Sequence, residues 1–319
     1  MDMTTEQDAI VLSQANLGYS EFSRERWSTF RAEVAMNLSS SEMEALISSA
    51  QPMTPEEVMN ILLPLSRLLN LNFAATRTVS QAQADFLGLP LLRPPYIVGI
   101  SGSVAVGKSS FARVLSALLS SWPGSPHVQL VTTDSFLFPL ATLAEKNLLH
   151  RKGFPESYDK SLFLGFLHSV CNKGEAVPIP TYSHVRYDIV PNEMQRVQSP
   201  DIIVLEGLNV LQEGNCSGLN VLDFIDFSIY IDASPDDIKK WYLERFVYLK
   251  NTAFQSAESY FNKFKNLSDL EALSMASDTW DRVNLTNLVE HILPTRERDS
   301  LIINKSSDHS IDRLLLRAI

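Results

Sequence analysis

The chain has 319 residues, 45% of them hydrophobic, so it is long enough to bury a large core as one large or two small domains. Its 27 Lys and Arg against 37 Asp and Glu give a net charge of −10, which argues against nucleic acid or an anionic membrane as the main partner. The two distant cysteines, Cys171 and Cys216, have no metal-ligand spacing and fit a reducing cytosol. The acidic start lacks the basic residues of a signal peptide, and no apolar run approaches the length of a membrane helix.

Residues 1–90 are predicted to be a helical segment packed on the core, and residues 91–319 a second unit. Thr54–Glu57 has the pattern of a capping box with proline at the first helical position, and Ser41–Glu44 offers another. An apolar face follows the Thr54 box at helical spacing. Pro64 lies within that face, so we expect the helix to kink or restart there.

The stretch Gly102–Ser109 reads Gly-Ser-Val-Ala-Val-Gly-Lys-Ser and matches the G-x-x-x-x-G-K-[ST] pattern of a phosphate-binding loop, or P-loop. The run Tyr96–Ile100 before it predicts a buried strand, and apolar residues at helical spacing from Phe111 to Trp122 predict a helix after it. A helix N-terminus adds partial positive charge to such a loop. This context favours a nucleotide site over a glycine turn that binds nothing.

Each residue type in the loop has a chemical role. Glycines let successive backbone N–H groups point at one anion. Lys108 would bring its charge to the β- and γ-phosphates, and the Ser109 hydroxyl would ligate Mg²⁺. The predicted nucleotide-binding residues are Gly102, Ser103, Val104, Ala105, Val106, Gly107, Lys108, Ser109 and Ser110.

Acidic residues end two of the later predicted strands. Asp134 follows the strand 127–133, and Glu206 closes the strand 201–207. Because ligands bind beyond the carboxyl ends of parallel strands, both belong on the P-loop edge. Asp134 would orient and deprotonate an attacking hydroxyl or hold the metal, with a helix N-cap or surface acid as the alternative. Glu206 resembles a Walker B acid that reaches Mg²⁺, with an ordinary strand-end acid as the alternative.

Further strands are predicted at 226–232 and 300–304, and the tail 311–317 fits helix or strand. The helix from about Pro235 to Lys250 is a candidate lid, in which Arg245 would face the transferring group unless it is merely a solvated charge. The segment Pro178–Asp188 is predicted to be a turn-rich loop. The aromatic stretch Phe254–Phe264 is either core or a wall for a partly apolar substrate. The predicted fold is α/β, with a mostly parallel central sheet flanked by helices.

Five strings of this sequence together resemble the bacterial type I pantothenate kinases of the P-loop kinase superfamily. They are Gly102–Ser109, Gly153–Asp159, Tyr182–His184, Leu205–Leu211 and Ile292–Arg298. The resemblance runs from about Leu63 to the C-terminus and more loosely before it. It implies a cytoplasmic homodimer that uses ATP and Mg²⁺ to phosphorylate the primary hydroxyl of pantothenate, the first step toward coenzyme A, which inhibits it.

The resemblance also implies roles for individual residues. Lys108, Asp134 and Arg245 match the catalytic residues, with Asp134 as the base. The matched positions of the pantothenate pocket are Tyr182, His184, Tyr242 and Asn284, those associated with coenzyme A are Lys108, Arg113 and His184, and His309 matches a position near the adenine. The sequence departs from the family pattern at Ser135, Phe138 and Phe264, where Gly, His and Tyr are usual.

Two other functions fit parts of the sequence. A P-loop kinase of the uridine kinase or phosphoribulokinase type would share the loop and the strand-end acid. A non-catalytic nucleotide-binding regulator would have lost the base, the lid arginine or the metal acid, and this sequence retains a candidate for each.

Overall fold

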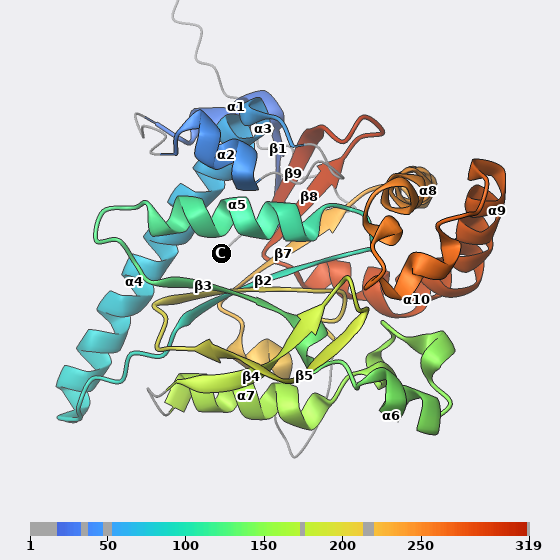
Figure 1. Cartoon of the computed structure of the whole chain (residues 1–319). Coiled ribbons are helices and arrows are strands. Elements are labelled where there is room, and N and C mark those ends of the chain that lie inside the picture. Colours follow the sequence, from blue (N-terminus) through green and yellow to red (C-terminus); the bar gives the residue numbers. More distant parts are fainter. Residues whose placement is uncertain (1–17, 33–37, 47–52, 173–175, 213–219, 318–319) are drawn as a thin grey trace, which may run out of the picture.

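The computed structural model describes residues 18–32, 38–46, 53–172, 176–212 and 220–317 (Figure 1). Cys216 and the acidic start of the chain lie outside these residues, and Cys171 is a free thiol. The division into a segment 1–90 and a unit 91–319 stays a prediction.

The structure is built on a seven-stranded, mostly parallel sheet. In spatial order its strands are β1 (Tyr19–Ser23), β9 (Ile311–Arg317), β8 (Leu301–Lys305), β7 (Phe227–Asp232), β2 (Tyr96–Gly102), β6 (Ile202–Glu206) and β3 (Val128–Thr132). Neighbours from β8 to β3 are parallel, and β9 is antiparallel to both β8 and β1. The predicted α/β fold is therefore confirmed, and the tail is a strand.

Both faces of the sheet are buried, which explains the continuous apolar runs of its central strands. Val98 and Ile100 of β2 pack in the cluster that contains residues of α5 (Lys108–Ser120) and α4 (Leu63–Leu87). Ile97, on the opposite face, belongs to the cluster with residues of α7 (Lys160–Asn172). Figure 1 shows α5 above the sheet and α7 below it, with α8 (Pro235–Asn251), α9 (Asp269–Thr279) and α10 (Leu285–Asn287) gathered beside the end at which α5 begins.

The N-terminal part is not wholly helical, so the all-helical prediction is wrong for β1. This strand buries Tyr19 and completes the sheet by pairing that residue with Arg317. Short helices follow: α1 (Arg24–Thr29), α2 (Ser40–Leu46) and α3 (Pro55–Glu57). The Thr54–Glu57 capping box is confirmed. The second box lies two residues earlier than predicted, because Ser39 and Glu42 exchange the bonds.

Helical backbone runs without interruption from Pro55 to Leu87. A π-helical turn, Val58–Leu62, separates α3 from α4 and places Pro64 in the first turn of α4. A proline has no N–H and crowds the preceding turn, so the wider π turn is the expected irregularity. By length and composition this helix could cross a membrane, with a mean hydropathy of 1.2 over its most apolar window. Its first part is buried with Leu62 and Leu65, and core helices pass the same test.

An antiparallel ribbon lies where the sequence predicted a loop. It consists of β4 (Val177–Ser183) and β5 (Asp188–Val197), with an irregularity between Pro180 and Tyr182. Proline is tolerated on such two-stranded ribbons because its missing N–H can face away from the ladder. The loop prediction for Pro178–Asp188 is therefore wrong for the residues that lie in β4. A further short helix, α6 (Leu140–Glu145), lies between β3 and α7 in the sequence.

Candidate active site

The P-loop connects β2 to α5 and depends on its glycines. Gly102 has a φ of +142°, and a Cβ there would lie 2.5 Å from the carbonyl oxygen of Ile231 on β7. Gly107 has a φ of +103° and directly precedes α5. Both positions exclude an ordinary side chain, so the loop can curl around an anion at the helix N-terminus.

Lys108 lies buried inside this loop, with 8% of its surface exposed, and its Nζ donates to the carbonyl oxygen of Ser103 at 2.7 Å. Burial lowers the pKa of Lys108 to about 8, while the carboxylates of Glu206 and Asp134 oppose that shift. The ammonium group is thus held close to both strand-end acids. The phosphates of a bound nucleotide would raise its pKa, because nearby negative charge favours the protonated form.

Glu206 meets the P-loop across the β2–β6 pair, in which Ile100 is the register partner of Glu206. The Ser109 hydroxyl donates to Glu206 Oε1 at 3.2 Å. Burial raises the pKa of Glu206, and Lys108 opposes this shift. A hydroxyl and a carboxylate beside a phosphate cradle fit Mg²⁺, which takes few protein ligands and completes its shell with phosphate and water. No group of three or more His, Cys, Asp or Glu that could hold a metal occurs among the residues that the structure describes.

Asp134 lies just beyond β3, in the 3₁₀ turn Thr133–Phe136. The alternative role as an N-cap fails, because Thr132 caps this turn by accepting from the Asp134 N–H at 3.3 Å. The carboxylate is half-buried and influences the pKa values of Lys108, Glu206 and Tyr182. It therefore lies at the centre of the charged groups.

Arg245 reaches the same site from α8. Its side chain is partly buried, and its Nε is buried without a hydrogen-bond partner. Burial lowers the pKa of Arg245, and Glu206 opposes that shift. A solvated surface charge would show neither feature. A buried cation with an unused donor is suited to an anionic ligand.

The predicted substrate residues line the same region from three elements: β4, α8 and the π-helical turn Trp280–Asn284. The Tyr182 and His184 rings, on and just after β4, meet edge to face with centroids 5.1 Å apart, and His184 is exposed. Tyr242 of α8 is hydrogen-bonded to Asn284, which ends a π-helical turn, Trp280–Asn284. Burial raises the pKa of both tyrosines, so they stay neutral hydrogen-bonding groups.

Lys152 is a site residue that the sequence interpretation missed. Its Nζ donates to Tyr182 OH at 3.2 Å and to the Tyr187 carbonyl, and lies 3.6 Å from the Tyr187 ring centroid. Burial lowers its pKa to about 8, opposed by Asp134 and Asp188. The available signal was its place directly before Gly153–Asp159, one of the strings shared with the kinase family.

Two predicted residues lie at the margin of this cluster. His309, in the turn between β8 and β9, stacks on Trp241 with ring centroids 4.1 Å apart, and burial lowers its pKa to about 4. Arg113 is exposed on α5, where it donates to the Ser110 hydroxyl at 3.3 Å.

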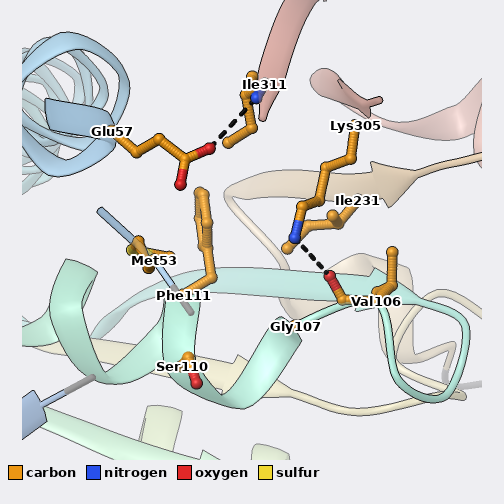
Figure 2. Close-up of a pocket in the computed structure, with 9 residues that line it drawn as sticks. All are labelled: Met53, Glu57, Val106, Gly107, Ser110, Phe111, Ile231, Lys305 and Ile311. Carbon is orange, nitrogen blue, oxygen red and sulfur yellow. Dashed lines mark hydrogen bonds between the residues drawn. The ribbon is translucent and has the colours of Figure 1, made fainter. Parts of the chain in front are cut away.

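A small, open pocket borders the P-loop on the side of the N-terminal helices (Figure 2). Lys305 enters it and donates to the carbonyl oxygen of Val106 at 3.2 Å, while Glu57 accepts from the Ile311 N–H at 3.2 Å. Its lining residues are Met53, Glu57, Val106, Gly107, Ser110, Phe111, Ile231, Lys305 and Ile311. The sequence interpretation named neither Lys305 nor Glu57 as a site residue.

The aromatic stretch forms a stacked cluster rather than an open wall. Phe261 lies 4.9 Å from Phe254 and 4.9 Å from Tyr187, measured between ring centroids. Phe254 is buried, whereas Tyr260 is exposed. The cluster touches the candidate substrate region through Tyr187, and its role as a wall for a substrate stays a prediction.

A phosphate loop at a parallel-sheet edge, with two strand-end acids and a buried arginine from a covering helix, defines a kinase of the P-loop class. Residues 97–247 match the phosphoribulokinase / uridine kinase family. The fold is also found in D-glycerate 3-kinase from Cryptococcus neoformans var. grubii, with a TM-score of 0.50 and 13% identity over 77% of this chain and 97% of that one.

The comparison with curated proteins identifies the family. The chain is 48% identical to the pantothenate kinase of Shewanella halifaxensis, covering 95% of this chain and 97% of that protein. It is 46% identical to the pantothenate kinase of Mycolicibacterium smegmatis, covering 94% and 97%. The chain belongs to the pantothenate kinase family.

Proposed function

We propose that this chain transfers the γ-phosphoryl group of ATP to the primary hydroxyl of pantothenate, giving 4′-phosphopantothenate, the first step of coenzyme A biosynthesis in the cytoplasm. The observation that carries the proposal is the meeting of Lys108, Asp134 and Arg245 around the buried Glu206 carboxylate. Kinship with the pantothenate kinases selects the substrate.

The roles follow from the chemistry of phosphoryl transfer, in which catalysis is mainly positioning and charge stabilisation. The P-loop amides and Lys108 hold the phosphates, and Arg245 faces the charge that spreads over the transferring group. Asp134 orients the pantothenate hydroxyl and accepts its proton. Ser109 and Glu206 would hold Mg²⁺, which would supply neutralisation of the phosphate charge.

The binding residues divide between the two substrates. Tyr182, His184, Tyr242 and Asn284 hold pantothenate, for which the two neutral phenols and the amide supply hydrogen bonds. The pocket of Figure 2 takes the nucleoside of ATP, because it adjoins the phosphate loop and pairs an apolar wall with Lys305. His309 lies next to that pocket, since Lys305 and His309 both contact Trp241.

One assay separates this proposal from the two alternatives. ADP release by the purified chain is measured with ATP alone, with ATP and pantothenate, and with ATP and uridine. We expect strong stimulation by pantothenate, little by uridine, and loss of the stimulation in Lys108→Ala. Stimulation by uridine would indicate a uridine kinase, and ATP binding without turnover would indicate a regulator.

We also propose that coenzyme A inhibits by competing with ATP. Its phosphates would require the same P-loop N–H groups and Lys108, and one anion site cannot hold both ligands. His184 and Arg113 would add contacts, and the aromatic cluster around Phe261 would receive the thiol arm. Initial rates at several ATP and coenzyme A concentrations test this, and inhibition that high ATP cannot overcome would place the inhibitor at a separate site. His184→Gln should relieve inhibition more than it lowers turnover.

The active form is proposed to be a homodimer joined through α4. In Figure 1 one end of this helix leaves the body of the molecule, and most residues after Leu69 are exposed by their surface areas. Ala75, Val79, Ala82 and Phe86 follow one another at spacings of four, three and four, with Val79 57% and Phe86 88% exposed. This spacing is that of a coiled-coil seam, and an apolar stripe of this kind needs a partner helix.

A further inference from the structure

The carbonyl oxygen of Gly153 receives two side-chain amides. Asn209 Nδ2 and Asn287 Nδ2 each donate to it at 3.0 Å. Both asparagines are buried, with 8% and 5% of their surfaces exposed. A carbonyl oxygen has two lone pairs, so these two donors saturate it.

The amides come from two separate parts of the fold. Asn209 follows β6, three residues after Glu206, whereas Asn287 ends α10 in the helical run Asp269–Ile292. That run has a π-helical turn on each side of α10. Asn284, the partner of Tyr242, lies three residues before Asn287 and therefore on the same helix face. One helix face thus contacts both the predicted pantothenate pocket and Gly153.

Gly153 is fixed on its other side as well. Its N–H donates to Ser157 Oγ at 3.0 Å, and its φ of +93° belongs to the left-handed region that favours glycine. Lys152, the preceding residue, extends its ammonium group to Tyr182 and Tyr187 beside Asp134. The backbone from which Lys152 projects is therefore held by three side-chain bonds to a single glycine.

Holding the Gly153 carbonyl with buried amides lowers the stability of the fold. The Oδ1 atom of Asn287 is buried without a hydrogen-bond partner, whereas the side chain of Asn209 is hydrogen-bonded to the buried Tyr158 hydroxyl. Unpaired buried acceptors destabilise a fold, and each requires an explanation. A role in holding the Gly153 carbonyl supplies one, because the bond from Asn287 Nδ2 to that carbonyl fixes the orientation of the amide and with it the position of Oδ1.

We propose that Asn287 and Asn209 are positioning residues that hold Lys152 in place to stabilise the transferring phosphoryl group. The inference rests on the proposed function. Lys152 supplies a second, half-buried ammonium group near Asp134, in addition to Lys108. A preorganised charge of this kind accelerates transfer only while its backbone stays fixed.

A kinetic double-mutant cycle tests the proposal. Asn287→Ala is introduced into the wild type and into Lys152→Ala, and kcat and the KM for each substrate are measured. We expect kcat to fall about tenfold in the first background and less than about twofold in the second, because residues that act as a unit are non-additive. The KM for ATP should not change in either background.

Two further variants guard against a folding defect. Asn209→Ala removes the second amide and should show the same non-additivity, which decides the question if Asn287→Ala fails to fold. Asn172→Ala is the matched control. The exposed Asn172 amide also donates to a backbone carbonyl, that of His168 at 2.8 Å, but both residues lie on α7. The kcat of Asn172→Ala should equal that of the wild type.

Equal falls of kcat in both backgrounds would overturn the proposal, because they would assign the asparagines a general structural role. An unchanged kcat in Asn287→Ala and Asn209→Ala would overturn it as well. The cycle is also run on ATP hydrolysis without pantothenate. If the proposed function fails, pantothenate will not stimulate the wild type. If this inference fails, the effects of Asn287→Ala and Lys152→Ala on kcat will be additive, in ATP hydrolysis as well as in phosphoryl transfer to pantothenate.

Discussion

Lys108 and the half-buried Lys152 make nucleotide capture depend on pH. Burial lowers the pKa of both Lys108 and Lys152 to about 8, so each loses its charge as the pH rises through that value. Because bound phosphate favours the charged form, the free enzyme is affected most. We expect kcat/KM for ATP to fall above pH 8 and kcat to fall only at higher pH. Pre-steady-state and initial-rate profiles from pH 6 to 10 measure this.

Protein stability should move in the opposite direction over part of this range. The unfolded chain binds a proton at each lysine up to the ordinary pKa of 10.5, whereas the folded chain releases it near 8. The free energy of unfolding contributed by these groups therefore rises between about pH 8 and pH 10.5. A Tm that falls in step with kcat/KM from pH 8 to 9 would contradict the lysine assignment and indicate unfolding instead.

Asp134→Asn tests the base directly. Asparagine keeps the shape of the side chain but cannot accept the hydroxyl proton, so we expect kcat to fall by about 10²–10⁴. The Kd for ATP, measured by calorimetry, should change little. If ATP affinity falls as far as kcat does, Asp134 mainly serves the metal or the fold. Part of the kcat effect is positioning, because the transition state of phosphoryl transfer is loose.

At the residue scale, the sequence was informative where chemistry follows a fixed local spacing. The P-loop and the strand-end acids Asp134 and Glu206 could be placed, because each is defined by a strand or helix beside it. Lys152 and Lys305 could not be placed in this way. Their burial depends on contacts distant in the sequence, with Tyr182 and Val106 respectively. Local patterns carry no information about such contacts.

At the scale of elements, Gly207 sets how closely β6 approaches β3. A Cβ at Gly207 would lie 1.7 Å from Thr133 Oγ1 and 2.8 Å from Thr133 Cβ, and Thr133 is buried. Gly207→Ala must therefore separate the two strand ends that carry Glu206 and Asp134. We expect a loss of about 1–3 kcal/mol in the free energy of unfolding, as for other overpacked sites, together with a lower kcat. Denaturant unfolding and initial rates measure both.

Gly165→Ala is the matched control for that substitution. Gly165 lies in α7, and a Cβ there would meet no atom within 4 Å. Alanine has the higher helix propensity, so the variant should gain about 0.5–1 kcal/mol in the free energy of unfolding. Its kcat should not change. If both variants behaved alike, the close approach of Gly207 to Thr133 would not be the cause.

The elements that the sequence predicted well are those buried on both sides. The strands β2, β6 and β7 are continuous apolar runs and were placed to within a residue or two. By contrast, β1 is a five-residue edge strand whose partner, β9, lies at the other end of the chain. The ribbon β4–β5 contains prolines that locally favour loops. These segments form strands because of pairing between residues that are distant in the sequence or separated by a turn, and local propensity does not reveal such pairing.

At the scale of the whole molecule, the candidate site is assembled from distant parts of one chain. The P-loop, the ends of β3 and β6, α8 and α10 meet at one edge of the sheet (Figure 1). Lys152 joins them there through its contacts with Tyr182 and Asp134. The exposed half of α4 extends away from the body of the molecule. A second copy that packed against α4 would therefore leave the candidate active site accessible. Dimerisation and catalysis should therefore be separable by mutation.

Ala82→Glu tests the proposed dimer. It places a charge in the middle of the α4 stripe, next to Val79 and Phe86, where like charges of two copies would face each other. Ala74→Glu is the matched control, because Ala74 is also exposed on α4 but lies off the stripe formed by Ala75, Val79, Ala82 and Phe86. By light scattering, the wild type and Ala74→Glu should have twice the 35.7 kDa mass of one chain, and Ala82→Glu should have that mass once. Because association stabilises the folded form, the Tm of the wild type should rise with protein concentration and that of Ala82→Glu should not. A wild-type mass of one chain, or a dimer that survives Ala82→Glu, would mean that α4 is not the interface.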